Sequence, residues 1–208
     1  MDIDLMVLNV GNSRLAIGIF SAGSLEHVAR LPLEPRNQWA APINQAWSRI
    51  ANKPQPAIAA ASVNAALNDP LESEVLRLTN HTIEWVGDEL DIPIGVHTKE
   101  PRQTGVDRVL NMAAAYEQIG KACVVVDAGT AITVDCCDDR GDFLGGAIAP
   151  GLAMMLDALH EKTAALPRVA FEVPTQTFGD STATAIRQGV YHGVRGMEIG
   201  RASCRERV

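Results

Sequence analysis

The sequence is poor in cysteine and has no long apolar run. Its four cysteines lack the spacing of a zinc site and lie mostly within apolar stretches, so we expect reduced thiols in a cytoplasmic protein. The apolar stretches are strand-sized and interrupted by Gly, Asn or Asp, which argues against a membrane-spanning helix. Residues 1–4 are acidic rather than a basic and then apolar leader, and we expect no secretion signal.

A basic excess is also missing. The chain has 18 Lys and Arg residues against 25 Asp and Glu residues, a net charge of -7, which argues against a nucleic-acid-binding protein. Hydrophobic residues make up 47% of the chain and charged residues 21%, as in ordinary globular domains, so wholesale disorder is excluded. The length of 208 residues suits one large domain or two small ones, and we favour two.

The last eleven residues, 198–208, differ from the rest of the chain. They carry five charges and show neither apolar periodicity nor a cap. They match the in-frame translation of a common sequencing adapter that begins GAG ATC GGA AGA GCG, so we interpret them as non-native and expect the natural sequence to stop near Met197. A genuine basic tail is the alternative. We leave the segment out of the fold prediction, as for any fusion scar.

One pattern of strand, glycine turn and two further strands occurs twice. In the first copy the apolar residues 5–8 lead to Asn9 and then Gly11. In the second copy residues 123–126 lead to Asp127 and then Gly129. Alternating apolar residues predict the later strands, over residues 15–19 and 25–31 in one copy and 132–134 and 143–148 in the other. Two copies of one unit suggest two similar domains.

Helical spacing and caps predict the remaining elements. Helices are expected over residues 39–50, 69–78, 106–119, 152–159 and 182–194, and short strands over residues 57–63 and 83–86. We expect Asp69 and Asp180 to be N-caps, and Leu110, Ala113 and Ala114 to face inward. The predicted fold is α/β, with two mixed-sheet domains, residues 1–119 and 120–197, facing a cleft. If the halves match, the second lacks about one strand-helix-strand portion and is incomplete.

The two glycine turns have the composition of phosphate-binding loops. A tight turn between strands presents consecutive backbone N–H groups as an anion-binding nest, and Gly11 and Gly129 allow a ligand to approach closely. Asn12, Ser13 and Thr130 add short donors, and a carboxylate before the turn can hold a cation beside the phosphates. Ordinary hairpins are the alternative for one turn alone. Because the turn occurs twice, each time after a strongly apolar strand, we favour phosphate binding.

A third segment, Thr104-Gly105-Val106-Asp107-Arg108, opens the predicted helix over residues 106–119. Thr104 and Asp107 have the spacing of a helix capping pair, and an acidic residue in the first turn suits the helix dipole. Alternatively, adjacent Asp and Arg side chains at a domain junction can serve as a general base and an anion-binding fork. Taken alone, the segment favours capping.

Together these segments resemble the type III pantothenate kinases, a family of the actin/hexokinase/Hsp70-like ATPase superfamily. The resemblance extends from Leu5 to about Gly196. Five segments match the family in order: Asn9-Val10-Gly11-Asn12-Ser13-Arg14, Ala61-Ser62-Val63-Asn64, Gly105-Val106-Asp107-Arg108, Asp127-Ala128-Gly129-Thr130-Ala131-Ile132-Thr133 and Gly145-Gly146-Ala147-Ile148-Ala149-Pro150-Gly151. Thr182 and Gly189 match a later segment. Each match is weak alone, and five in register are strong.

The resemblance implies two ribonuclease H-like domains of the actin-like ATPase type and a homodimer that phosphorylates the 4′-hydroxyl of pantothenate with ATP, the first step of coenzyme A biosynthesis. It implies Asp107 as the proton acceptor and Asp127 as the ligand of a monovalent cation, K⁺ or NH₄⁺, with Mg²⁺ accompanying ATP. The ATP-binding residues that it implies are Asn9, Val10, Gly11, Asn12, Ser13, Arg14, Leu15, Ala16 and Thr130. The pantothenate-binding residues that it implies are Thr98, Gly105, Val106, Asp107, Arg108 and Thr182. Phosphoryl transfer requires chiefly positioning and charge neutralisation, which two nests, a metal and one base can supply.

Three features depart from the family pattern. Asn9 stands where the family usually has Asp, and Thr98 where it usually has an aromatic residue. The family's last segment, a Thr-Gly-Gly motif near the adenosine, has no counterpart, so we expect a truncated chain that lacks it. Asn9 and Thr98 favour the alternative of a catalytically inactive regulator like Bvg accessory factor, whereas Asp107, Arg108 and Asp127 favour the kinase. A sugar or acetate kinase of the same superfamily would leave the Gly-x-Asp-Arg match unexplained.

Overall fold

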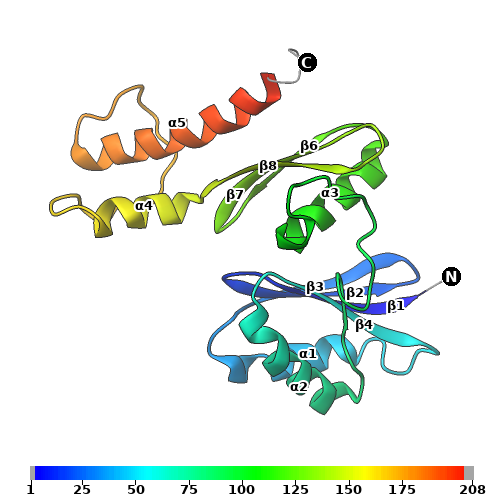
Figure 1. Ribbon diagram of the computed structural model, residues 1–208. Helices are drawn as coiled ribbons and strands as arrows, with labels where there is room; N and C mark the ends of the chain where they lie inside the picture. Colours follow the sequence, from blue (N-terminus) through cyan, green and yellow to red (C-terminus); the bar gives the residue numbers. More distant parts are fainter. Residues whose placement is uncertain (1–2, 204–208) are drawn as a thin grey trace. The chain divides into compact units, whose positions relative to one another are not determined.

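The computed structural model describes residues 3–203, and the chain divides into two compact units. The first unit comprises Met1–Gly95 and Glu100–Asn111, and the second comprises Val96–Lys99 and Met112–Val208. Helix α3 (Val106–Ile119) therefore contributes its first turns to the first unit and its later turns to the second (Figure 1). The domain limits predicted from the sequence, 1–119 and 120–197, stay predictions.

The first unit is built on a five-stranded mixed sheet. Its strands are β1 (Asp4–Val10), β2 (Arg14–Ser21), β3 (Ser24–Pro32), β4 (Pro56–Ser62) and β5 (Glu84–Trp85). Their order in the sheet is β3-β2-β1-β4-β5. The first three strands pair antiparallel through short hairpins, whereas β4 and β5 join in parallel after helical crossovers. The mixed sheet expected from the sequence is therefore present in this unit.

Two helices cover one face of this sheet (Figure 1). They are α1 (Ala40–Trp47) and α2 (Asn68–Thr79), and the short 3-10 turns η1 (Arg36–Gln38) and η2 (Ala65–Leu67) precede them. Met6, Leu8 and Val10 alternate along β1 and pack in one core with Ile43 and Val75 of the helices. Burying a side chain of this size contributes roughly 1.5–3 kcal/mol. The period of two in the strand and of 3.6 in the helices places the core on this face.

Helix α2 begins two residues before Pro70, the first helical residue that an Asp69 N-cap predicts. Asn68 is its first residue, so Asp69 lies in the first turn, where an acidic side chain suits the helix dipole, and is not the N-cap. The N-cap is Leu67, which makes no side-chain cap hydrogen bond. The helix ends at Thr79, and the C-cap Asn80, which has a left-handed backbone (φ 57°), donates its N–H to Leu76 O at 2.9 Å.

The second unit contains a three-stranded sheet of β6 (Val124–Ala128), β7 (Ala131–Cys137) and β8 (Phe143–Pro150). Both pairs in the order β6-β7-β8 are antiparallel. The mixed sheet expected for this half is therefore not seen within residues 3–203, because short hairpins join antiparallel neighbours. Helices α4 (Leu152–Glu161) and α5 (Thr182–Ser203) follow the sheet and share a small core around Leu156, Ile186 and Val190.

A capping box starts α5. Ser181 Oγ accepts a hydrogen bond from the Thr184 N–H (3.3 Å), and Thr184 Oγ1 accepts one from the Ser181 N–H (2.9 Å). Ser181, rather than the predicted Asp180, is thus the N-cap. The helix continues past Met197 to Ser203, into the segment interpreted as adapter sequence, whose origin stays a prediction, and residues 204–208 lie outside the described part of the chain. Neither α5 nor any other helix in residues 3–203 is long and apolar enough to cross a membrane.

Helix α3 turns a different face inward than the sequence predicted. Val109 and Met112 are buried, whereas Leu110 and Ala113 are half-buried and Ala114 is exposed. The buried residues are three positions apart, as neighbours on one helical face are, so the inward stripe lies about one residue before the predicted one.

Candidate active site

A cavity of about 170 Å³ lies in the first unit, over the neighbouring strands β1 and β4. Val7 lies beside Ala59 and Asn9 beside Ala61 in the parallel register of these strands. Along β1, Val7 and Asn9 alternate with the residues that are buried in the core of the unit. Leu110 of α3 also lines the cavity. The alanine side chains of β4 are small, so they leave room here that larger residues would fill.

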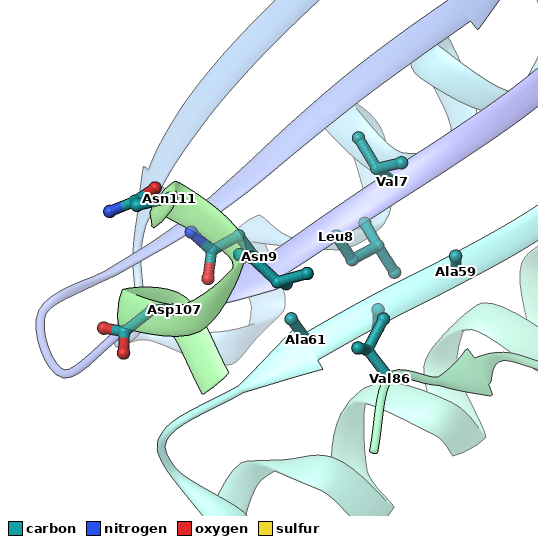
Figure 2. A pocket seen from close by; sticks show the side chains of 10 residues that line it. Val7, Leu8, Asn9, Ala59, Ala61, Val86, Asp107 and Asn111 are labelled. Atoms are coloured by element: carbon teal, nitrogen blue, oxygen red, sulfur yellow. The ribbon is translucent and has the colours of Figure 1, made fainter. Parts of the chain in front are cut away.

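Three polar side chains gather at one end of this cavity (Figure 2). Asn9 comes from β1, and Asp107 and Asn111 come from α3. Asp107 and Asn111 are four residues apart, which places them one helical turn apart on the same face. The labelled side chains at the other end, including Val7, Leu8 and Val86, are apolar. Acid–base chemistry in the cavity is therefore confined to the end that holds Asp107.

The start of α3 positions the Asp107 carboxylate. Its Oδ1 accepts a hydrogen bond from the Arg108 N–H at 2.8 Å, and its Oδ2 has no partner within residues 3–203. Gly105 makes room for this arrangement, because a Cβ at that position would lie 2.8 Å from Asp107 Oδ1. The Thr104 N–H donates to Pro101 O at 3.2 Å, so Asp107 does not accept it as the predicted capping pair requires. One carboxylate oxygen serves the helix start, and the other is available to a ligand.

The first glycine hairpin joins β1 to β2. The Gly11 N–H donates to Arg14 O at 3.0 Å and closes the turn, whose residues Asn12 and Ser13 are exposed. The Gly11 amide therefore serves the hairpin, and any phosphate contact has to use other donors of the loop. Three further residues predicted to bind ATP, Val10, Leu15 and Ala16, lie in the paired strands. The side chains of Val10 and Leu15 are buried in the core of the unit. These residues can therefore contribute to a nucleotide site only through their backbone groups and by holding the turn in place.

The second glycine hairpin, between β6 and β7, is one residue shorter than the first. The Gly129 N–H donates to Ala131 O at 2.9 Å, two residues on, whereas the Gly11 N–H donates to a carbonyl three residues on, and both bonds close their turns. Asp127 and Thr130 are exposed on either side of the glycine. The Gly151 N–H, at the start of α4, donates to Thr130 O at 3.0 Å and fixes the loop from the next element. The Gly-rich segment that ends at Gly151 therefore supports this loop.

The predicted site residues are distributed over both units. Asn9 and Asp107 line one cavity, and Gly105, Val106 and Arg108 flank Asp107 at the start of α3. The second unit contains Thr98, Asp127, Thr130 and Thr182. Within that unit Thr98 lies near β8, because its neighbour His97 donates its N–H to Phe143 O at 2.8 Å. Thr182 is exposed as the first residue of α5.

Sequence reasoning overlooked Asn111. The signal was its position four residues after Asp107 on a predicted helix, but polar residues on a helix more often face solvent.

Within residues 3–203, no group of three or more His, Cys, Asp or Glu side chains is placed to hold a metal ion. Cys123, Cys136 and Cys137 are free thiols, and Cys204 lies outside the described residues.

A family model described as type III pantothenate kinase matches residues 5–200. The chain belongs to this family. The type III pantothenate kinases of Solibacter usitatus (strain Ellin6076) and Moorella thermoacetica (strain ATCC 39073 / JCM 9320) are 32% and 30% identical to it over 201 residues. These alignments cover 94% of this chain and 77% and 79% of the two relatives. The range matched by the type III pantothenate kinase model contains both glycine hairpins and the whole cavity.

A solved structure shares the fold. A conserved Baf family protein from Campylobacter jejuni matches 91% of this chain and 75% of its own chain with a TM-score of 0.55 and 22% sequence identity. At this identity the likeness concerns the fold of this type III pantothenate kinase family member and not its activity.

Proposed function

We propose that this protein transfers the γ-phosphoryl group of ATP to the 4′-hydroxyl of pantothenate, the first step of coenzyme A biosynthesis. The observation that carries the proposal is the position of Asp107, which presents one unpaired carboxylate oxygen, within residues 3–203, at the polar end of the cavity. Membership of the type III pantothenate kinase family supports the choice of substrates.

In the proposed reaction Asp107 is the general base. Its carboxylate accepts the hydroxyl proton as the hydroxyl oxygen attacks the γ-phosphorus of ATP. A P–O bond forms to the acceptor while the bond from the γ-phosphorus to the bridging oxygen breaks, and ADP leaves. A positioned base of this kind contributes about 10²–10⁴-fold to the rate. The remaining acceleration comes from alignment of the two substrates and from neutralisation of the phosphate charge.

The glycine hairpins are the proposed binding sites for the triphosphate. Because the Gly11 and Gly129 amides close their own turns, the proposed donors are the other amides of each loop and the side chains of Asn12, Ser13 and Thr130. Arg14, which is exposed at the end of the first turn, adds a positive charge beside that loop. Backbone and side-chain donors fixed in the loops can attract phosphate locally, even in a protein whose net charge is -7.

The residues described in the structure can bind cations that are already coordinated by the phosphates of the nucleotide. Mg²⁺ commonly keeps several waters and binds to substrate phosphates through one or two protein oxygens, so it needs no cluster of acidic residues. Asn9 can offer a carbonyl oxygen from the polar end of the cavity, although without the charge of an Asp. Asp127, exposed beside the second hairpin, is the proposed ligand of K⁺ or NH₄⁺. A bound cation would neutralise charge on the β- and γ-phosphates.

The rest of the assembly is part of the same proposal. Thr98, Gly105, Val106, Arg108 and Thr182 are proposed to complete the pantothenate site. Two actin-like domains are proposed for the chain, in a cytoplasmic homodimer. The mixed sheet of the first unit, with strand order β3-β2-β1-β4-β5, supports the first of these two domains.

A coupled assay of ADP release tests the proposed function. The whole gene product should turn over only when ATP, Mg²⁺ and pantothenate are all present, and K⁺ should stimulate it. Asp107→Asn should lower kcat by about 100-fold or more, since it removes the base and keeps the shape. Glu117→Gln, an exposed charge removal later on the same helix, is the matched control and should retain wild-type turnover.

Two outcomes would contradict this assignment. Absence of turnover by the wild-type protein with every substrate present would favour a regulatory relative without kinase activity. Normal turnover by Asp107→Asn would reduce Asp107 to a helix-capping residue.

A further inference from the structure

Asn111 is the third polar side chain at the end of the cavity that holds Asp107 and Asn9 (Figure 2). The proposed reaction assigns Asp107 to the proton of the acceptor and Asn9, which precedes the first hairpin, to the nucleotide side. Asn111 remains as a neutral side chain with both a donor and an acceptor group.

The spacing of Asp107 and Asn111 on α3 allows both side chains to reach the same small group. Side chains four residues apart on a helix have Cβ atoms about 5–6 Å apart and point to the same side. Both residues line the same cavity of about 170 Å³, where Asp107 is half-buried and Asn111 is exposed, so a group bound at its polar end is next to both side chains.

We propose that Asn111 orients the acceptor hydroxyl by donating an amide N–H to its oxygen, and this inference rests on the proposed function. A hydroxyl that donates its proton to Asp107 keeps two lone pairs on oxygen. One lone pair accepts the Asn111 N–H, which stops rotation of the hydroxyl about its C–O bond. The other lone pair then points away from both side chains and is free to attack phosphorus.

A neutral amide suits this position better than a charged donor. A Lys or Arg here would pair with the Asp107 carboxylate and lower its ability to accept a proton. The Asn amide fixes the direction of the hydroxyl and leaves the charge of the base unchanged. Asn111 is therefore a substrate-orienting residue, and Asp107 alone exchanges the proton.

The test compares two ligands that differ only in the hydroxyl. Calorimetry measures binding of pantothenate and of an analogue whose 4′-hydroxyl is replaced by hydrogen, each with a non-hydrolysable ATP analogue, Mg²⁺ and K⁺. Asn111→Ala should weaken pantothenate binding by about 10-fold, or about 1.4 kcal/mol, and leave the affinity for the deoxy analogue unchanged. Asn44→Ala, an exposed Asn on α1 outside the cavity, is the matched control and should change neither affinity.

An isosteric variant separates orientation from packing. Asn111→Asp keeps the shape but replaces the donor by a second carboxylate beside Asp107, so kcat should fall at least as far as in Asn111→Ala. Equal losses of affinity for the two ligands, or wild-type kinetics in Asn111→Asp, would overturn the role of Asn111. If wild-type protein binds neither ligand, the proposed function itself is wrong and the inference fails with it.

Discussion

The two glycine hairpins share one local pattern and differ in what surrounds them. In the first unit β1 has β2 on one side and β4 on the other, and Leu8 is 2% exposed. In the second unit β6 lies at the edge of the sheet formed within residues 3–203, and Val124 and Val126 are 37% and 43% exposed. The turn and its Gly N–H hydrogen bond are therefore local properties. Burial of the side chains of the strand depends on helices packed on the face of the sheet, which in the first unit are α1 and α2.

The same difference extends to the hydrophobic cores. The first unit buries side chains from β1, β2, β4, α1 and α2 in one cluster. The cluster between α4 and α5 of the second unit is small, and half-buried residues such as Leu159 and Leu166 border it. A residue removed from the larger cluster leaves a cavity that its neighbours cannot fill, whereas the smaller cluster can relax toward solvent.

The largest expected effect compares these two cores. Trp39→Ala should destabilise the protein by about 3–5 kcal/mol, because this side chain is 2% exposed in the core of the first unit. Leu156→Ala in the second unit should cost about 2 kcal/mol, the low end for a buried Leu. Urea unfolding followed by circular dichroism measures both, with the exposed Leu25→Ala as the control. Equal losses would show that the two units are packed alike.

A smaller effect separates the two hairpins. A Cβ at Gly129 would lie 3.7 Å from Ala131 O, an ordinary contact, whereas one at Gly11 would lie 3.3 Å from Arg14 O. Gly129→Ala should therefore leave the unfolding midpoint near the wild-type value and weaken ATP binding by about 10-fold, since the methyl group occupies space that phosphate needs. Gly11→Ala should lower both the unfolding midpoint and the affinity for ATP.

Isothermal titration with ATP and thermal unfolding check this pair of variants. The exposed Gly193→Ala, whose Cβ would meet open space, is the control. If Gly129→Ala binds ATP like the wild type, the second hairpin is an ordinary turn that does not bind phosphate.

The sequence predicted much of the fold because the decisive patterns were local. Apolar runs located β1 and β6, and the glycine turns located both hairpins. Two caps were wrong because another polar residue lay next to the predicted one: Asn68 extends α2, and Ser181 starts α5 in place of Asp180. In each case the residue at which the helix starts depends on the backbone geometry of the whole segment, which no single residue determines.

The candidate site was only partly predictable. Asp107 and Asn9 followed from the family resemblance, and both line the cavity. The cavity itself depends on the register that sets Asn9 beside Ala61, two segments far apart in the chain. Asn111 resembled a solvent-facing residue, and it is exposed in the structure, so only the placement of α3 beside the sheet shows that it also lines the cavity.

The smallest expected effect is a pH dependence of the second unit. The Arg140 N–H, at 2.9 Å, and the Asp142 N–H, at 3.0 Å, donate to Asp138 Oδ1 and hold the pKa of this carboxyl below its usual value. A pKa that is lowered by folding contributes stability above the pKa of the unfolded chain, about 4, and this contribution is lost as pH falls through the folded pKa. The turn between β7 and β8 should therefore weaken in acid.

Thermal unfolding of the wild type and Asp138→Asn between pH 7 and pH 2 checks this expectation. The wild type should be slightly more stable at neutral pH, and the two curves should converge below about pH 4. In the first unit Glu74 is the counterpart, because a hydrogen bond from the Arg77 side chain lowers its pKa. A difference between wild type and Asp138→Asn that persists at pH 2 would show that charge is not the cause.

Helix α3 has a practical consequence for dividing this protein into parts. The boundary between Asn111 and Met112 falls inside one continuous helix, with Asp107 about 7 Å before it along the axis. Tyr116, on the other side, donates its hydroxyl hydrogen to Asp139 O at 2.8 Å. A fragment cut at this boundary would leave the proposed base on a frayed helical end. Expression of either half alone therefore removes support from the residue on which catalysis depends.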